Sequence, residues 1–456
     1  MIARISSEVH FAQHQFNHGG VYGATASGIP SRIAVTLLTG GSDRPYVFGL
    51  TMSLLSQGAA IDLIGSNELC FPEFSAQPAV QFLNFRGSTH SDADFVTKIA
   101  RVLKYYFRLI AYAPIARPKI FHILWNNKFE TFDRTLLTLF YKLLGKKVVL
   151  TAHNVNTARR DAKDTVLNRL TLRVQYHLVN QIFVHTEDMK REMIGEFGVR
   201  DSRITVIPFG INNAVPNSAL SSPEARRRLG IHEGEKVLLF FGRITPYKGL
   251  EYLISAFRQA AARSGNYRLV LAGRPDRCEE YWKGIRADID GDVKEARILV
   301  QAEFIRDEDV ETYFKAADAL VLPYRDVYLS GVLFLGQSFG LPVLAADVGS
   351  LKDDIQEGEN GYLFRPEDPQ GLAAAIDKYF ASELYANLDS LRPVIRAQAA
   401  TLHSWAIVSQ MTMSVYARLL HLEFADAAHE SSHIDLPDGK NKTSVSGSAS
   451  LSTLVE

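Results

Sequence analysis

The sequence has few of the features that mark secreted or membrane-spanning proteins. Only two cysteines, Cys70 and Cys278, occur among 456 residues, and they lie far apart. This favours a reducing compartment and excludes a disulfide scaffold or a cysteine-based zinc site. No apolar run approaches the roughly 18 residues that span a bilayer, and the N-terminus has no apolar core of the signal-peptide type. We therefore expect a cytoplasmic protein that reaches, at most, the inner face of the membrane.

Net charge and several familiar phosphate-binding motifs are also missing. The 50 Lys and Arg balance the 50 Asp and Glu, which argues against a general polyanion binder, so we expect no nucleic-acid partner. The chain has no GxxxxGK(S/T) loop, and TGGSDRP at 39–45 lacks GxGxxG spacing, so kinase and dehydrogenase functions are disfavoured. The acid–x–acid triplets at 92–94, 288–290 and 307–309 do not directly follow a strand. We therefore predict neither a metal site nor a cofactor.

What the sequence does contain is a repeated alternation of short apolar strands and amphipathic helices. The expected strands are 32–39, 60–66, 120–125, 147–154, 181–186 and 204–209 in the first half, and 237–244, 267–274, 298–305, 319–324 and 342–347 in the second. Short apolar strands separated by helices predict parallel sheets covered on both faces. We predict an α/β fold with two doubly wound, Rossmann-like domains facing a cleft, where ligands bind beyond the carboxyl ends of the strands.

Composition suggests where these domains begin and end. We expect a loose extension at 1–30, a first Rossmann-like domain at 31–213 and a second at 214–400. A C-terminal helix within 401–427 is expected to pack back on the molecule. The Ser-, Gly- and Lys-containing tail at 428–456 lacks a core-forming pattern and is expected to be disordered.

The most informative run is FFGRITPYKGLEYLISAF at 240–257. A strand ends at Gly242, a turn carries Arg243 and Lys248, and a helix begins near Leu250. Two cations beside a helix N-terminus suit a diphosphate, because Lys supplies a point charge and Arg a fork of donors. The alternative is two solvated cations on an ordinary surface turn.

A second run, LPYRDVYLSGVLFLGQSFGLPVLAADVG, follows at 322–349. Ser330, Gly331 and Val332 are expected at the N-terminus of a helix, which is another position suited to a phosphate. The alternative is an ordinary loop with a flexible glycine.

Together, in this order and spacing, the two runs resemble the group 1 glycosyltransferases, a retaining family with the GT-B fold. The resemblance covers about residues 32–425. It implies that Arg243 and Lys248 contact the donor diphosphate, that Gly242 and the Ser330–Val332 backbone line the phosphates, and that Phe304 and Ile305 hold the base.

One departure from the family pattern concerns an acid. The family often carries two glutamates with seven residues between them, and the second falls here on Leu335. Leu335 cannot accept a hydrogen bond from a ribose hydroxyl. Either Asp326 or a backbone group takes this role, or the donor binds differently.

Two loops of the first half are candidates for the acceptor side. Gly40 and Gly41 follow the first strand, where glycine lets the backbone approach a ligand, although a plain tight turn explains them equally well. His153 and Asn154 close another strand, at the edge where such sheets bind ligands. By resemblance this histidine contacts the transferred sugar, and the alternative is a histidine satisfied in the core.

Residues 98–119 form a basic amphipathic segment with six basic residues and no acids. Ile99, Leu103 and Ile110 share one helical stripe with Val102 and Tyr106. The segment is typical of a membrane-surface element that finds a lipid-linked acceptor. A core-packed helix with a solvated basic face is the alternative.

These observations predict a hexosyltransferase-type glycosyltransferase in polysaccharide or lipid-linked glycan synthesis. It moves a sugar from a nucleoside diphosphate sugar to a saccharide or lipid-linked acceptor hydroxyl, and the resemblance implies retention of anomeric configuration. The catalytic residues expected are His153, Arg243 and Lys248. Two alternatives stay open: a non-catalytic assembly partner on the same fold, and a sugar-nucleotide epimerase.

Overall fold

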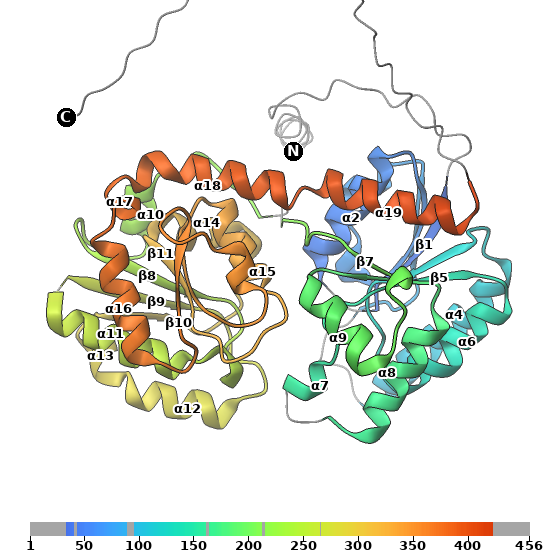
Figure 1. Cartoon of the computed structure of the whole chain (residues 1–456), viewed down its shortest axis with the longest axis horizontal. Helices are drawn as coiled ribbons and strands as arrows, with labels where there is room; N and C mark the ends of the chain where they lie inside the picture. Colours follow the sequence, from blue (N-terminus) through green and yellow to red (C-terminus); the bar gives the residue numbers. More distant parts are fainter. Residues whose placement is uncertain are drawn as a thin grey trace, which may run out of the picture. The chain divides into compact units, whose positions relative to one another are not determined.

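A computed structural model describes residues 33–40, 43–88, 95–160, 164–211, 215–264 and 266–422. The expected N-terminal extension at 1–30, the expected tail at 428–456 and Gly41 lie outside the described residues. Within the described part, the chain forms two parallel sheets that are each covered by helices on both faces (Figure 1).

The first sheet has seven parallel strands in the order β3-β2-β1-β4-β5-β6-β7. Its strands are β1 (Ala34–Leu38), β2 (Ala60–Gly65), β3 (Val80–Asn84), β4 (Ile120–Ile123), β5 (Lys147–Thr151), β6 (Gln181–Val184) and β7 (Ile204–Val206). The order reverses between β1 and β4, and in such sheets ligands bind beyond the carboxyl ends of the strands near this switch point.

Helices cover both faces of this sheet. They are α2 (Arg44–Ser56), η1 (Asn67–Leu69), α3 (Pro72–Ser75), α4 (Phe95–Ile115), α5 (Glu130–Phe132), the π-helical η2 (Asp133–Leu137), α6 (Thr138–Leu143), α7 (Thr157–Arg160), α8 (Val166–Leu178), α9 (Glu187–Phe197) and η3 (Asp201–Arg203). The core on one face includes α2, and the core on the other includes α4, α6, α8 and α9. Strands buried on both faces read as continuous apolar runs, which is why the sequence pattern revealed them.

The second sheet has six parallel strands in the order β10-β9-β8-β11-β12-β13. Its strands are β8 (Lys236–Phe241), β9 (Tyr267–Ala272), β10 (Ile298–Gln301), β11 (Ala319–Leu322), β12 (Val343–Ala346) and β13 (Gly361–Phe364). Its helices are α10 (Ser222–Arg228), η4 (Pro246–Lys248), α11 (Leu250–Ser264), α12 (Glu279–Asp288), α13 (Asp290–Lys294), α14 (Asp307–Ala316), α15 (Gly331–Ser338), η5 (Leu351–Asp354), α16 (Pro369–Phe380), α17 (Glu383–Ala386) and α18 (Leu388–Leu402).

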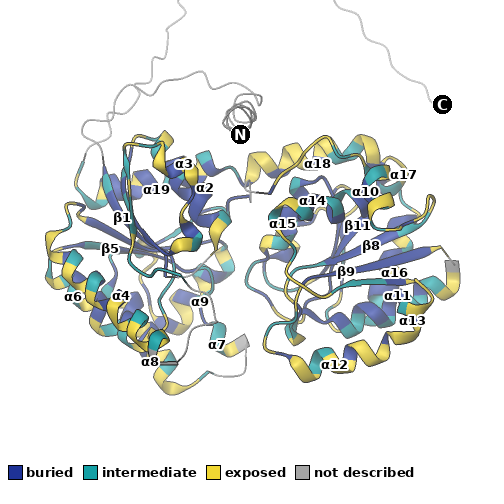
Figure 2. Cartoon of the chain, turned by 180° about the vertical axis from the view of Figure 1, so that it is seen from behind, coloured by how far each residue is buried: buried dark blue, intermediate teal, exposed yellow. Residues whose placement is uncertain are grey.

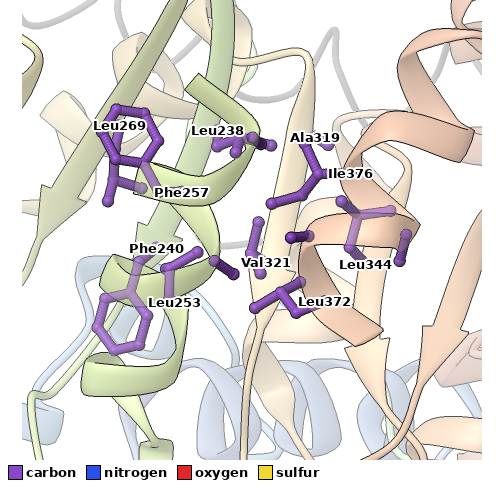
Figure 3. Packing of buried hydrophobic residues seen from close by; sticks show 14 of the residues in the cluster. Leu238, Phe240, Leu253, Phe257, Leu269, Ala319, Val321, Leu344, Leu372 and Ile376 are labelled. Carbon is purple, nitrogen blue, oxygen red and sulfur yellow. The ribbon is translucent and has the colours of Figure 1, made fainter. Parts of the chain in front are cut away.

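The core of the second domain is apolar throughout on the face covered by α11 and α16. Figure 3 shows Leu253 and Phe257 of α11 packing toward strand residues such as Phe240 and Val321. Leu372 of α16 packs onto the same face, and all five side chains are 0% exposed. Each buried side chain of this size contributes about 1.5–3 kcal/mol to stability, so this core holds the loops at the carboxyl edge in place.

The last helix, α19 (Trp405–Leu419), returns to the first domain and packs against α2. The indole nitrogen of Trp405 donates to the carbonyl of Ile211 at 2.7 Å, and the Ser53 hydroxyl donates to the Trp405 carbonyl at 2.6 Å. A Cβ added at Gly49 would lie 2.1 Å from the indole ring. Position 49 of α2 therefore requires glycine, because any larger residue would collide with the Trp405 indole of α19.

Several details differ from the sequence expectations. β3 was not predicted, because VQFLN is a half-buried edge strand without a continuous apolar run. The strand expected at 298–305 ends at Gln301, so Phe304 and Ile305 lie in the loop that follows it rather than closing the strand. The C-terminal helix also begins later, at Trp405, because the Ser404 side chain caps it by accepting from the amide of Ala406.

Candidate functional site

The candidate donor site lies at the carboxyl end of β8. The strand is followed by Gly242, the single turn of η4 and then α11. Gly242 has φ +101°, a conformation that favours glycine, and a Cβ placed there would lie 3.1 Å from Lys248 Nζ and 3.3 Å from Val332 Cγ2. Three of the residues predicted to hold the donor therefore converge on one point.

Lys248 is a buried cation, with only 6% of its surface exposed. Its Nζ lies 5.1 Å from the centre of the Tyr324 ring and 5.8 Å from that of Phe240. A cation over aromatic faces is attracted by their quadrupoles, which offsets part of the cost of its burial. The structure therefore places a positive charge beside the chain turn at Gly242.

The N-terminus of α15 faces the same region. Ser330 occupies the N-cap position, but its side chain does not cap the helix, and its hydroxyl lies 3.5 Å from that of Tyr324. The first-turn amides of Gly331 and Val332 are thus not occupied by the N-cap side chain, and a helix N-terminus of this kind favours an anion. Gly331 is exposed, as access for a ligand requires.

The other donor candidates are more open. The Arg243 side chain is 70% exposed and pairs with Asp276 at 3.2 Å, so it is a solvent-exposed cation, unlike Lys248. Asp326 is exposed in the loop after β11, and Phe304 is 66% exposed. Ile305 packs against the apolar core.

Leu335 is buried in the apolar core of the second domain and is 7% exposed. The side chain in the position of the family's second acid therefore serves packing. It offers nothing to a ribose hydroxyl.

On the acceptor side, His153 follows β5 inside a cluster of aromatic rings. Its ring stacks on Trp125 with centroids 4.2 Å apart and planes 10° apart, and Tyr46 meets it edge-on at 4.7 Å. His153 Nδ1 lies 3.0 Å from Nε2 of His185. Burial, followed by the neighbouring His185 and His122, lowers the pKa of His153 well below its ordinary value. The ring is therefore neutral at pH 7.

The glycine loop contacts the loop after β4. A Cβ at Gly40, which has φ +45°, would lie 1.9 Å from the Trp125 carbonyl oxygen, so only glycine permits this approach. The Arg86 guanidinium donates to the Gly40 carbonyl at 2.6 Å. A pocket of about 160 Å³ is lined by Trp125, His153, Asn154 and their neighbours. His153 and Asn154 thus line the same pocket, and Gly40 packs against the backbone of Trp125, which lines it too.

A larger pocket of about 420 Å³ is lined by both domains. His185 and Phe209 contribute from the first domain and its connection, and Leu329 and Phe334 from the loop and first turn of α15. Phe209 stacks on Phe334 at 5.7 Å and lies 6.1 Å from the ring of His153. This volume is within the range of small-molecule sites. Neither Lys248 nor Arg243 lines it.

Sequence reasoning missed four residues that organise these sites: Trp125, His185, Phe209 and Tyr324. Each follows a strand, so position alone was a usable signal. Which of many such residues touch His153 or Lys248 depends on tertiary packing. Among the described residues, no group of three or more His, Cys, Asp or Glu is arranged to hold a metal ion.

Solved structures share this architecture. Sucrose-phosphate synthase from Thermosynechococcus elongatus matches with a TM-score of 0.66 and 18% identity, over 86% of this chain and 100% of that one. HepE from Anabaena, in complex with UDP and glucose, matches with a TM-score of 0.64 and 16% identity, over 85% of this chain and 100% of that one. The two facing parallel-sheet domains define the GT-B class of folds, as predicted.

Sequence comparisons define the family. A model described as Glycosyltransferase Family 4 matches residues 46–215, and one described as Glycosyl transferases group 1 matches residues 235–382. The chain belongs to the group 1 glycosyltransferases. A D-inositol 3-phosphate glycosyltransferase of Nocardiopsis dassonvillei is 25% identical over 85% of this chain and 94% of the relative. An uncharacterized glycosyltransferase of Methanocaldococcus jannaschii is 27% identical over 52% of this chain and 59% of the relative, so the chain spans only about three fifths of that protein.

Proposed function

We propose that this protein transfers a hexose from a nucleoside diphosphate sugar to an acceptor hydroxyl, with retention of configuration and without a metal ion. The observation that carries the proposal is the convergence of buried Lys248, Gly242 and the N-terminus of α15. HepE, which shares the fold, was solved with UDP and with UDP-glucose, and this supports a nucleotide sugar as the donor here. Polysaccharide or lipid-linked glycan synthesis is the proposed setting.

The chemistry follows from where negative charge develops. As the glycosidic bond breaks, charge builds on the leaving diphosphate, and fixed positive groups near it lower the barrier. Lys248 and the α15 N-terminus are already in place, and Arg243 exchanges Asp276 for the diphosphate when the donor binds. These groups supply the charge that a divalent cation supplies in metal-dependent transferases.

The remaining donor contacts complete the proposal. Phe304 and Ile305 hold the base from the loop after β10, and Asp326 or a backbone group takes the ribose hydroxyls in place of the acid that Leu335 replaces. Loss of a hydrogen bond to a charged group costs about 1.5–3 kcal/mol, which weakens donor binding without abolishing it. His153 and Asn154 face the sugar and the acceptor.

A thermal-shift panel of nucleoside diphosphates and their sugars tests donor binding, because a ligand that binds only the folded chain raises its Tm. Release of nucleoside diphosphate that requires an acceptor then tests transfer. We expect Arg243→Ala and Lys248→Ala to abolish turnover while the fold is retained. Conversion of the donor without an acceptor would identify an epimerase instead, and the absence of any release would identify a non-catalytic partner.

The acceptor is proposed to be lipid-linked, because α4 and α6 expose a basic apolar surface. α4 buries Tyr106 on one face, whereas Leu103, Phe107 and Ile110 are 60%, 73% and 41% exposed on the other. The stripe expected from the sequence is thus divided between core and surface. Leu136, Leu139 and Leu143 of η2 and α6 are also exposed, at 62%, 40% and 77%.

Both helices cover the same face of the first sheet, and Figure 2 shows exposed residues along each of them. We define the α4–α6 surface as the exposed apolar residues Leu103, Phe107, Ile110, Leu136, Leu139 and Leu143, together with Lys98 and Lys104. Lys98 and Lys104 are exposed, and no acid occurs between residues 95 and 119. Basic groups around inserted apolar side chains suit anionic headgroups, each contributing about 1 kcal/mol. None of the described helices is both long and apolar enough to cross a bilayer.

Sedimentation with vesicles tests this contact. We expect the protein to bind vesicles that contain phosphatidylglycerol but not pure phosphatidylcholine vesicles, and Leu103→Glu with Phe107→Glu to abolish binding. Val394→Glu with Leu402→Glu on α18 is the matched control, since these side chains are 48% and 61% exposed elsewhere. If both double variants lost vesicle binding to the same extent, the membrane contact could not be assigned to α4.

A further inference from the structure

His185 connects a backbone carbonyl to His153. Its Nδ1 lies 3.2 Å from the carbonyl oxygen of Ile207, and its Nε2 lies 3.0 Å from Nδ1 of His153. A carbonyl oxygen can only accept a hydrogen bond, so Nδ1 of His185 carries the hydrogen. In a neutral ring the other nitrogen then has none. Nε2 of His185 is therefore an acceptor.

The same reasoning extends to His153. Since His185 Nε2 accepts, His153 Nδ1 must donate, and Nε2 of the neutral His153 ring carries a lone pair and no hydrogen. The opposite tautomer would set two acceptors against each other at 3.0 Å. Burial supports neutral rings, because it lowers the pKa of His185 to about 4 and that of His153 well below its ordinary value.

His153 Nε2 makes no hydrogen bond within the part of the chain that the structure describes, although it is buried. The ring cannot easily turn to find another partner, because Trp125 stacks on one face and Tyr46 meets it edge-on. A buried acceptor without a partner in a pocket wall is an exception that needs an explanation. A ligand hydroxyl that donates to Nε2 would supply the missing bond.

We infer that His185 is a positioning residue that fixes His153 in the tautomer with hydrogen on Nδ1, so that His153 Nε2 accepts a hydrogen bond from a hydroxyl of the bound sugar. The inference rests on the proposed function, because it takes the ligand to be a sugar. It also explains specificity: a bare nitrogen recognises a hydroxyl, which can donate, and discriminates against fluorine, which cannot.

Nitrogen-15 NMR of the full-length, ligand-free protein with labelled histidine tests the tautomer without any turnover. Signals of His153 are assigned by comparison with a His153→Asn variant. We expect hydrogen on Nδ1 and a bare Nε2 in the wild type and in His185→Gln, whose side-chain carbonyl can still accept. His185→Leu offers no acceptor, and we expect it to lose this tautomer preference. Hydrogen on His153 Nε2 in the wild type would overturn the inference.

Kinetics test the consequence. The active donor from the nucleotide-sugar panel is compared with analogues in which each sugar hydroxyl in turn is replaced by fluorine. At one position we expect the wild type to show a KM about 10- to 100-fold higher for the fluorinated donor. His185→Gln should keep this ratio, and His185→Leu should bring it close to one.

His177→Leu is the matched control, because His177 is exposed and its Nδ1 bonds to the carbonyl of Arg173 in its own helix. It should leave every ratio unchanged. Equal discrimination in the wild type and in folded His185→Leu would overturn the role of His185. If no nucleotide sugar is turned over, the proposed function fails, while the NMR result still decides the tautomer.

Discussion

Replacing Lys248 with methionine tests the donor site most directly. Methionine keeps most of the apolar stem and removes the charge, which lies 5.1 Å from the Tyr324 ring and beside Gly242. Removing one preorganised group that stabilises a transition-state charge costs about 2.7–4 kcal/mol, a loss of about 100- to 1,000-fold in kcat. We therefore expect a loss of this size for Lys248→Met.

The variant should keep its fold and still unfold cooperatively in urea, because methionine adapts to the apolar space that the lysine stem occupies. Release of nucleoside diphosphate measures kcat, and urea unfolding measures stability.

Lys146→Met is the matched control. Lys146 is also buried, at 8% exposure, and its Nζ lies 5.0 Å from the Phe121 ring, but it is in the first domain and donates to the carbonyls of Ala116 and Pro118. Its replacement should cost stability and leave kcat within about threefold of the wild type. A Lys248→Met enzyme as active as the control would refute the reasoning that Lys248 stabilises the leaving group.

Three further predictions follow from the packing and charge of the folded chain. Gly242→Ala should abolish donor-induced thermal shifts, because the added Cβ would lie 3.1 Å from Lys248 Nζ. Gly58→Ala is the control: Gly58 has φ +83° and no atom within 4 Å of an added Cβ, so this variant should have similar backbone strain and still bind the donor. Trp405→Ala should lower the free energy of unfolding by about 3–5 kcal/mol in urea, whereas Leu402→Ala, at an exposed position, should stay within about 0.5 kcal/mol. Burial lowers the pKa of His185 from 6.5 to about 4. Its contribution to stability is therefore complete above pH 6.5 and is lost as the pH falls toward 4, by on the order of 3 kcal/mol. A pH series of urea unfolding curves should show a shallower decline for His185→Gln, and an unchanged slope would contradict this pKa.

Much of the fold could be predicted because it depends on local pattern. Both sheets are parallel and largely buried on both faces, so most of their strands appear as short apolar runs and were predicted. The exceptions are the half-buried edge strand β3 and the last strand, β13. The turn carrying Lys248 was recognised from the order of strand, glycine, cation and helix. The departure at Leu335 was also visible, and its burial in the core shows that packing occupies this position.

Other features could not be predicted, because they join residues distant in sequence. His153 and His185 are 32 residues apart, and Trp405 reaches Ile211 across 194 residues. No local pattern determines such pairs, since strand order and helix packing decide which side chains meet. The tautomer of His153 belongs to this group, because it depends on a neighbour's hydrogen bond to a backbone carbonyl.

The sequence by itself thus determined the class of fold, the family and the turn that carries the donor-side cation, because each depends on residues close together in the chain. Only the tertiary structure decided that Lys248 is buried whereas Arg243 is exposed, and that His153 is held by Trp125 and His185. Burial and hydrogen-bond partners are properties of the assembled core, and they exist only after the strands have taken their order in the sheet.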